Sequence, residues 1–299
     1  MRALVTGGRG FVGRWLCARL EACGDTVLAT GEEADVTDPA KLWPAVEGFS
    51  PDAIYHLAGQ AHVGRSWDDP AGTYRVNLLG TVHVLDAARR LPTAPRVLVV
   101  SSAEVYGRVG PDELPISEEA APRPSSPYAA SKYAAEIAAR QAFDGYGVPA
   151  VVARPFNHIG PGQSPAFVVS ALAKRIVAAE RAGGTRLEMG NATPRRDLAD
   201  VRDVVRAYRL LVERGEPGEA YNVATGRDVM IGDLARRLIE LSGADLELVT
   251  DAVELRPVDV PVLRGDPTKL RRVTGWSPEI DLDRTLREVL DFWRADAPG

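Results

Sequence analysis

A glycine-rich turn near the start of the chain reads Thr6-Gly7-Gly8-Arg9-Gly10-Phe11-Val12-Gly13. It follows a short apolar run at residues 3–6 and opens a segment of helical period at residues 11–23. Glycines spaced by three residues let the backbone approach a pyrophosphate, and the N-terminus of the following helix offers free N–H groups and partial positive charge. Glycine-rich turns alone are common, but a strand before this one and a helix after it predict a dinucleotide site. The residues expected to contact the dinucleotide are Gly7, Gly10, Phe11, Val12 and Gly13.

Short β-branched runs alternate with helical patterns through the first half of the chain. The strands are expected at residues 3–6, 26–29, 53–57, 96–100 and 150–153, and the helices at residues 11–23, 39–48, 72–91 and 127–146. This alternation predicts an α/β fold in which helices cover both faces of a doubly wound parallel sheet, the Rossmann arrangement. In such sheets, ligands bind beyond the carboxyl ends of the strands.

The regular alternation breaks after about residue 155. Helical patterns follow at residues 167–182, 201–214, 231–241 and 282–294. We therefore expect a dinucleotide-binding domain over residues 1–155, to which later segments return, and a smaller α/β substrate lobe formed mainly by residues 156–299. The active cleft should lie between them.

The 299 residues include 36 basic and 41 acidic side chains, a net charge of −5. This balance argues against a nucleic-acid binder that relies on a basic surface, although a few local arginines can still hold a small anion. Cys17 and Cys23 form neither a disulfide framework nor a metal pattern, so we expect no metal. The chain begins directly with a strand and has no apolar run of membrane-spanning length, so we expect a cytoplasmic protein with no membrane partner.

Tyr128 and Lys132 lie four residues apart at the start of the helix expected at 127–146. Side chains at this spacing share a helix face, so the phenol and the ammonium can point into one site. A neighbouring cation lowers the pKa of a tyrosine from its ordinary value of about 10, which suits a proton donor at neutral pH. Ser102 follows the fourth strand, where its hydroxyl can hold a carbonyl oxygen beside the phenol. A surface pair and a capping serine are the plain alternatives, but only four lysines occur in the chain, and the combination predicts a catalytic site.

The end of the second strand normally distinguishes NADH from NADPH. An acidic side chain there binds the ribose 2′-hydroxyl, whereas an arginine favours a 2′-phosphate. Gly31 stands where the acid is expected, with Glu32 beside it and Arg9 in the glycine-rich turn. Both cofactors stay open, and NADPH is favoured if the enzyme catalyses a reduction. Asp35 and Val36 are candidates for contact with the adenine, although a plain surface turn explains them equally well.

Together with these motifs, three further segments give a resemblance that covers essentially the whole chain. They are His56-Leu57-Ala58-Gly59, Asn77 within Val76-Asn77-Leu78-Leu79-Gly80-Thr81, and Arg154-Pro155-Phe156-Asn157-His158-Ile159-Gly160-Pro161-Gly162-Gln163. The chain resembles the extended short-chain dehydrogenase/reductase family of nucleotide-sugar enzymes, and within it the GDP-6-deoxy-D-mannose reductases. The resemblance implies that Leu57, Ala58, Gly59 and Asn77 line the dinucleotide. It also implies that Tyr128 and Lys132 contact the nicotinamide ribose.

The same resemblance implies a GDP-sugar as substrate. A nucleoside diphosphate needs fixed cationic donors, and the planar fork of arginine suits phosphate. Arg196 and Arg256 are the candidates, with Asn157 and Asn191 as neutral hydrogen-bond donors. The chain holds 32 arginines, so a solvated surface position explains either arginine equally well.

The activity implied by the resemblance is NAD(P)H-dependent reduction of the C4 ketone of GDP-4-keto-6-deoxy-D-mannose to GDP-D-rhamnose. Glu104, two residues after Ser102, matches the elimination base of GDP-mannose 4,6-dehydratases and keeps a dehydratase open, with an epimerase third. A non-catalytic dinucleotide-binding protein is a further alternative, but it has no need of a complete Ser/Tyr/Lys set. The resemblance also implies a homodimer in which the helices at 72–91 and 127–146 form a four-helix bundle.

Overall fold

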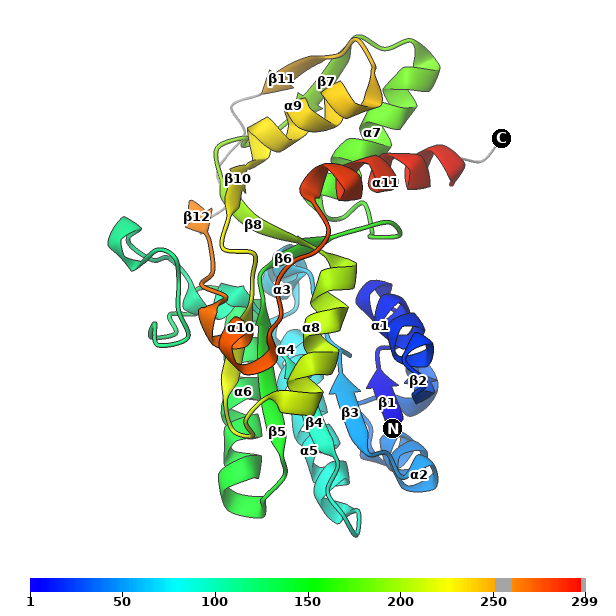
Figure 1. Ribbon diagram of the computed structural model, residues 1–299, viewed down its shortest axis with the longest axis vertical. Helices are drawn as coiled ribbons and strands as arrows, with labels where there is room; N and C mark the ends of the chain where they lie inside the picture. The colour runs from blue at the N-terminus through cyan, green and yellow to red at the C-terminus, as the bar shows by residue number, and fades with distance from the viewer. Residues whose placement is uncertain (251–259, 297–299) are drawn as a thin grey trace.

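The computed structural model describes residues 1–250 and 260–296. Its larger part is a six-stranded parallel sheet with the order β2-β1-β3-β4-β5-β9 (Figure 1). The strands are β1 (Arg2–Thr6), β2 (Thr26–Thr30), β3 (Ala53–His56), β4 (Arg96–Val100), β5 (Ala150–Pro155) and β9 (Ala220–Val223). The five strands expected in the first half are all present, and β9 joins them from the second half. The fold is therefore the predicted doubly wound α/β arrangement.

Helices cover both faces of this sheet because its strands are apolar on both sides. One face packs against α1 (Phe11–Ala22), α8 (Val201–Arg214) and α10 (Thr268–Thr274). The other face packs against α2 (Pro39–Phe49), α5 (Gly80–Arg90) and α6 (Pro127–Tyr146). The three central residues of β4 are buried, as expected for a strand in the middle of the sheet.

The single helix expected at residues 72–91 is instead two helices joined by a π-helical turn. This segment consists of α4 (Pro70–Tyr74), the turn η2 (Arg75–Leu79) and α5. A short helix, α3 (Val63–Asp68), comes before it. The π turn contains Asn77, whose side chain is buried. Turns of this kind often occur close to functional sites.

The carboxyl ends of the parallel strands lie at one edge of the sheet. The register pairs Thr6 at the end of β1 with Thr30 and with His56. The Thr6 hydroxyl lies 2.8 Å from His56 Nδ1, and His56 Nε2 lies 3.1 Å from the Thr81 hydroxyl. These bonds tie the start of the glycine-rich turn to β3 and α5. From β1 the chain adds β2 on one side of the sheet and then β3 on the other side of β1. Doubly wound sheets form their ligand crevice at such a switch point.

A smaller lobe stands beyond the carboxyl ends of the strands (Figure 1). Four of its strands form one sheet and two form another, with three helices packed around a shared apolar core. The strands are β6 (Asn157–Ile159), β7 (Arg186–Met189), β8 (Arg195–Asp200), β10 (Asp228–Met230), β11 (Glu247–Thr250) and β12 (Val262–Leu263), and the helices are α7 (Val168–Ala182), α9 (Ile231–Ser242) and α11 (Leu282–Ala295). Short 3₁₀ turns, η1 (Glu32–Ala34), η3 (Ala103–Tyr106) and η4 (Pro111–Glu113), follow β2 and β4.

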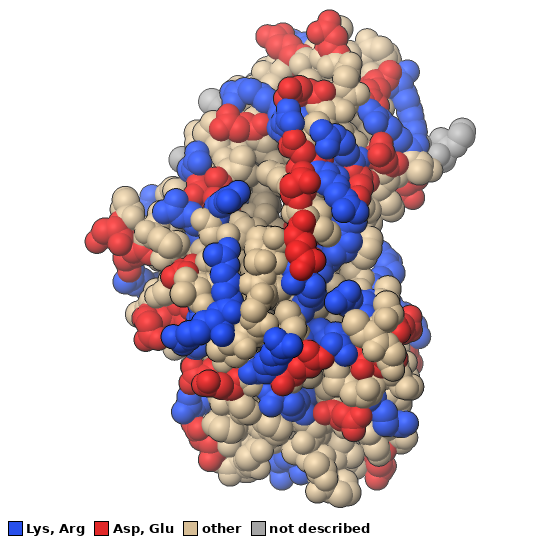
Figure 2. Space-filling model, in the orientation of Figure 1, with Lys and Arg blue, Asp and Glu red and all other residues tan. Residues whose placement is uncertain are grey.

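Basic and acidic side chains are interspersed over the face shown in Figure 2. Several arginines engage in ion pairs, such as Arg202 with both Asp200 and Glu288. No helix in residues 1–250 and 260–296 is long and apolar enough to span a bilayer. Within the same residues, no group of three or more His, Cys, Asp or Glu side chains could hold a metal ion.

Candidate active site

A cavity of about 770 Å³ opens at the carboxyl edge of the main sheet, with walls from both parts of the molecule. It brings together most of the residues expected at a site, namely Gly7, Gly10, Phe11, Val12, Gly13, Leu57, Ala58, Gly59, Ser102, Glu104, Tyr128, Lys132, Asn157, Asn191 and Arg196. Asp35, Val36 and Asn77 are not among its lining residues. Arg256 lies outside the described residues.

The glycine-rich turn is packed so closely that side chains would not fit. Gly7 has φ +68°, and a Cβ added to it would lie 2.8 Å from the Ala58 nitrogen. A Cβ on Gly13 would lie 2.3 Å from the Gly7 carbonyl oxygen. Helix α1 begins after Gly10 with no acidic residue in its first turn, and the residues of that turn line the cavity. Such a cradle of backbone N–H groups fits the pyrophosphate of a dinucleotide.

Asn77 lies beneath the cavity wall. Its Oδ1 accepts a 2.8 Å hydrogen bond from the Gln60 backbone N–H, and its Nδ2 donates to the Gln60 carbonyl at 3.2 Å and to the Ser131 hydroxyl at 2.9 Å. Both ends of the amide therefore hold Gln60, and Nδ2 also joins Asn77 to α6. In this structure Asn77 supports the residues that line the cavity.

Asp35 and Val36 form a turn after β2. The Asp35 carboxylate accepts bonds from the backbone N–H and the hydroxyl of Thr37, each at 2.9 Å. The Val36 side chain is buried, and its carbonyl oxygen lies 2.8 Å from a ring nitrogen of His83. The pair therefore forms a turn, but not the plain surface turn of the alternative, because the Val36 side chain is buried.

Ser102 and Tyr128 meet at the end of β4. Ser102 caps the turn η3, where its hydroxyl accepts from the Glu104 N–H at 3.2 Å. Burial raises the pKa of Tyr128 to about 12, and the negative charge of Glu104 adds to this increase. The hydrogen bond from Ser102 lowers the pKa, but by less. This differs from the expected lowering by Lys132, because desolvation outweighs every other influence on the phenol. The phenol is therefore protonated at neutral pH, as a proton donor must be.

Lys132 lies in the same cavity, one turn further along α6. Its ammonium donates a 2.8 Å hydrogen bond to the Val100 carbonyl at the end of β4. Burial lowers the pKa of Lys132 to about 8, and the carboxylate of Glu136 acts against that decrease. A Cβ added to Gly59 would lie 3.3 Å from the Lys132 nitrogen, so the glycine leaves room for the ammonium.

The smaller lobe contributes the expected polar groups. Asn157 is exposed on β6, the first strand of that lobe. Arg196 on β8 donates to the Val260 carbonyl at 2.8 Å. Asn191 closes a turn by accepting from the backbone N–H and the hydroxyl of Thr193 at 3.1 and 2.8 Å. These three side chains line the cavity from the smaller lobe, whereas the glycine-rich turn lines it from the main sheet.

Other residues of the cavity wall were not predicted. Among them are Gln60, Phe167, Arg175 and Tyr208. Gln60 directly follows the Leu57–Gly59 segment, so its position in the chain was an available signal. Tyr208 lies within α8, a position that no local motif marks, and its buried hydroxyl has no hydrogen-bond partner among the described residues.

Comparisons with known proteins agree with this geometry. A family model described as GDP-mannose 4,6 dehydratase matches residues 29–289. GDP-6-deoxy-D-mannose reductase from Pseudomonas aeruginosa is 40% identical over 300 residues, which cover 98% of this chain and 97% of that protein. This chain is an extended short-chain dehydrogenase/reductase. UDP-glucose 4-epimerase from Mycolicibacterium smegmatis is 33% identical over 324 residues, covering 98% of this chain and 99% of the epimerase.

Solved structures of this dehydrogenase/reductase family share the whole fold. The structure of RMD from Pseudomonas aeruginosa complexed with NADPH has a TM-score of 0.91 and 39% identity, covering 99% of this chain and 100% of that one. UDP-glucose 4-epimerase from Thermus thermophilus, in complex with NAD, has a TM-score of 0.89 and 30% identity over the same shares of the two chains. The chain is thus an NAD(P)-dependent enzyme of nucleotide-sugar chemistry in the epimerase, dehydratase and reductase family.

Proposed function

We propose that this enzyme reduces the C4 ketone of GDP-4-keto-6-deoxy-D-mannose to GDP-D-rhamnose. The observation that carries the proposal is the buried Tyr128 phenol together with Ser102 in a cavity that also contains the glycine-rich cradle. The similarity to GDP-6-deoxy-D-mannose reductase over nearly the full length of both proteins supports the same substrate.

Ser102, Tyr128 and Lys132 each have a role in this reaction. A bound reduced nicotinamide dinucleotide supplies the hydride that reaches the sugar C4. The Ser102 hydroxyl donates a hydrogen bond that orients the ketone oxygen, and Tyr128 delivers a proton to that oxygen as the alkoxide forms. Lys132 anchors the nicotinamide ribose through its ammonium. Holding the reactants in one geometry contributes about 7–11 kcal/mol of the barrier reduction in well-oriented systems.

We assign the cofactor as NADPH. Arg9 and Glu33 form a 2.9 Å ion pair at the end of β2, and a Cβ on Gly31 would lie 3.2 Å from Arg9 Cδ. The guanidinium is therefore beside the position that recognises the adenosine ribose, and a cation there favours a 2′-phosphate. RMD from Pseudomonas aeruginosa, which has the same fold, was solved with NADPH.

The two-part division follows the two ligands. We assign residues 1–155 to dinucleotide binding, together with the returning elements β9, α8 and α10, and most of residues 156–299 to the sugar nucleotide. Arg196, Asn157 and Asn191 are our candidates for contact with the GDP-sugar, because they line the cavity from the smaller lobe. Arg256 remains a candidate on sequence grounds.

A dehydratase is the second candidate, and Glu104 is the observation that favours it. Its carboxylate influences the Tyr128 phenol from the adjoining turn, so a base and an acid lie close together in the cavity. A dehydratase would use Glu104 to remove a proton next to a transient ketone. The chain's 40% identity to the reductase, against 28% to GDP-mannose 4,6-dehydratase from Yersinia enterocolitica, supports the reductase.

We also propose a homodimer through a four-helix bundle of α5 and α6 from each subunit. Nine large apolar side chains are exposed among the described residues, and six of them belong to the segment α3–α6. These six are Trp67, Tyr74, Leu79, Val82, Ile137 and Tyr146. A concentration of apolar side chains on one group of helices is typical of a surface that another subunit covers.

Paired incubations test the reaction. The protein is offered GDP-4-keto-6-deoxymannose with NADPH or NADH in one set and GDP-mannose with oxidised cofactor in another. The reductase predicts that the ketone is consumed together with the reduced cofactor, and that GDP-mannose is left unchanged. Conversion of GDP-mannose to a 4-keto sugar would instead establish the dehydratase.

A further inference from the structure

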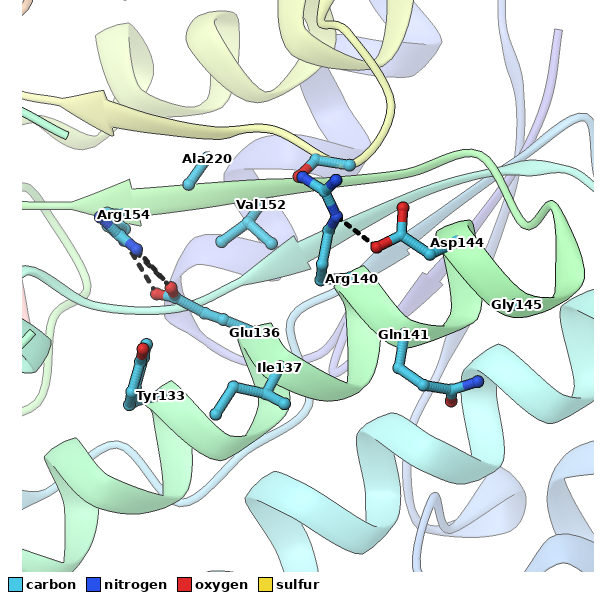
Figure 3. Close-up of a pocket in the computed structure, with 11 residues that line it drawn as sticks. Tyr133, Glu136, Ile137, Arg140, Gln141, Asp144, Gly145, Val152, Arg154 and Ala220 are labelled. Carbon is cyan, nitrogen blue, oxygen red and sulfur yellow. Dashed lines mark hydrogen bonds and ion pairs between the residues drawn. The ribbon is translucent and has the colours of Figure 1, made fainter. Parts of the chain in front are cut away.

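A buried ion pair lies one helical turn after Lys132, outside the residues used in the proposed reaction. Glu136 on α6 and Arg154 on β5 are only 6% and 7% exposed, and their side chains meet between the helix and the strand (Figure 3). Arg154 Nη2 donates to Glu136 Oε2 at 2.6 Å, and Arg154 Nε donates to Oε1 at 3.0 Å. Such a two-point contact holds the carboxylate of Glu136 in one position.

Glu136 is also tied to the strand end that binds Lys132. Its Oε1 accepts a hydrogen bond from the Ser101 hydroxyl. Ser101 directly follows Val100, whose carbonyl oxygen accepts the bond from the Lys132 ammonium. Lys132 and Glu136 share one face of α6, so the two side chains reach consecutive residues of β4 and the loop after it.

The ammonium of Lys132 needs a compensating charge because it is only 9% exposed. Burial disfavours a charged amine and lowers the pKa of Lys132 to about 8, whereas the Glu136 carboxylate raises it. An uncompensated amine in such a site would lose its proton near neutral pH. Glu136 thus supplies the negative charge that opposes this loss.

The other titratable groups around Lys132 act differently. Burial and the charge of Lys132 lower the pKa of His56 on β3 to about 3, so this ring is neutral. Tyr128 on α6 is protonated, and Glu104 in η3 acts on Tyr128. Arg154 on β5 is positive, but its guanidinium is bound to Glu136 and to the Tyr106 hydroxyl at 2.9 Å.

We propose that Glu136 is a positioning residue for Lys132. Held by Arg154, its carboxylate binds Ser101 and so fixes the end of β4, where the Val100 carbonyl holds the ammonium, and its negative charge keeps the ammonium charged inside a buried site. This inference rests on the proposed function, in which the charged ammonium binds the ribose of the cofactor. Arg154 and Ser101 then act one step further away, by holding Glu136.

The test is the pH dependence of NADPH binding to the whole enzyme with no sugar present. The dissociation constant is measured from the fluorescence of bound NADPH across neutral and alkaline pH, for wild type and for Glu136→Gln. This substitution keeps the shape of the side chain and an acceptor for Arg154, but it removes the charge. Because the Lys132 pKa then falls, the loss of NADPH binding begins at a lower pH. We expect the midpoint, the pH halfway through this loss, to decrease by about one pH unit or more.

Three further variants separate charge from structure. Glu136→Asp keeps the charge, so its midpoint should return towards that of wild type. Glu180→Gln removes a more exposed ion pair between α7 and α11, where Glu180 meets Arg294 at 2.7 Å, and should not move the midpoint. The double variant Glu136→Met with Arg154→Met replaces both buried charges by apolar side chains, a change that folds usually tolerate. It should move the midpoint in the same direction as Glu136→Gln even if the single variant fails to fold.

The proposal is overturned if a folded variant without the Glu136 charge keeps the wild-type midpoint, whatever its thermal stability. Lys132→Met separates this failure from failure of the proposed cofactor site, because it should abolish the alkaline loss of binding. A wild-type profile that Lys132→Met leaves unchanged would reject the cofactor role of Lys132 and the Glu136 proposal together. A profile that responds to Lys132→Met but not to loss of the Glu136 charge would reject the Glu136 proposal alone.

Discussion

At the scale of single residues, the site is governed by burial. Tyr128 and Lys132 are both nearly inaccessible, and burial acts on them in opposite directions because it favours the neutral form of each. The phenol therefore keeps its proton, while the ammonium needs a neighbouring carboxylate. For a reduction this is the useful combination, since the proton must be on the phenol before the hydride is transferred.

Replacing Tyr128 by Phe should remove the proton donor without disturbing the fold. The ring of Tyr128 stays buried among the same neighbours, so we expect kcat to fall about 10²–10⁴-fold. The dissociation constant for NADPH should change little. Steady-state kinetics and cofactor titration measure the two effects separately. Wild-type turnover in Tyr128→Phe would mean that another group donates the proton.

Replacing Arg9 by Ala should reduce the preference for NADPH. The Arg9 side chain is 70% exposed, and its guanidinium is expected to contact the 2′-phosphate, so we predict about tenfold weaker NADPH binding, equivalent to about 1.4 kcal/mol. NADH binding should be unaffected, because NADH has no such phosphate. Arg19→Ala, at an exposed position on α1, is the matched control. An equal loss for both dinucleotides would place Arg9 outside the recognition of the phosphate.

At the scale of elements, the glycine-rich turn and α1 act as one unit. The turn approaches Ala58, the end of β2 and its own backbone so closely that three glycine positions of the motif leave no space for a Cβ, namely Gly7, Gly8 and Gly13. Tight backbone packing of this kind positions the first turn of α1 against the end of β1. The N-terminal N–H groups of the helix are thereby directed at the cavity.

Gly13→Ala should disrupt this unit although alanine favours a helix. The added Cβ would lie 2.3 Å from the Gly7 carbonyl oxygen, so we expect a loss of stability of about 1–3 kcal/mol and a large loss of cofactor affinity. Gly48→Ala in α2 is the matched control, because its Cβ meets nothing within 4 Å. It should stabilise the protein by up to about 1 kcal/mol. Denaturant unfolding and NADPH titration check both, and equal behaviour of the two variants would contradict the packing argument.

Elements whose formation depends on residues close together in the chain could be predicted from the sequence. Glycine spacing, strand periodicity and the Tyr128–Lys132 pair are each set by neighbours in the chain, and the five strands of the first half were confirmed. The π turn that contains Asn77 was missed, and the side-chain bonds of Asn77 to Gln60 and Ser131 join residues that are distant in sequence. The raised pKa of Tyr128 was missed for a related reason, since burial depends on how the two parts of the molecule pack.

At the scale of the whole molecule, the carboxyl edge of the main sheet and the smaller lobe both line one cavity. We propose that the sheet edge binds the dinucleotide and the smaller lobe binds the sugar nucleotide. Of the nine large apolar side chains exposed among the described residues, six lie instead in the segment α3–α6, whereas Phe167 and Val168 line the cavity. The proposed dimer therefore leaves the cavity of each subunit complete, and both subunits should be able to react.

Ile137→Arg should separate the subunits. Ile137 is 55% exposed on α6, so a charge there is tolerated in the monomer but is costly in an apolar interface. We expect wild type to have the mass of a dimer at micromolar concentration and the variant to have that of a monomer, measured by light scattering. Ala18→Arg, on α1 at the opposite face of the sheet, should leave the dimer intact. A monomeric wild type would contradict the bundle.

The most direct test of the central claim follows the hydride itself. NADPH that carries deuterium at the transferable C4 position is incubated with the enzyme and GDP-4-keto-6-deoxymannose, and the sugar product is analysed by mass spectrometry and NMR. The account predicts GDP-rhamnose with one deuterium at sugar C4 and one NADPH oxidised per product. A product without deuterium at C4, or no oxidation of NADPH, would contradict it.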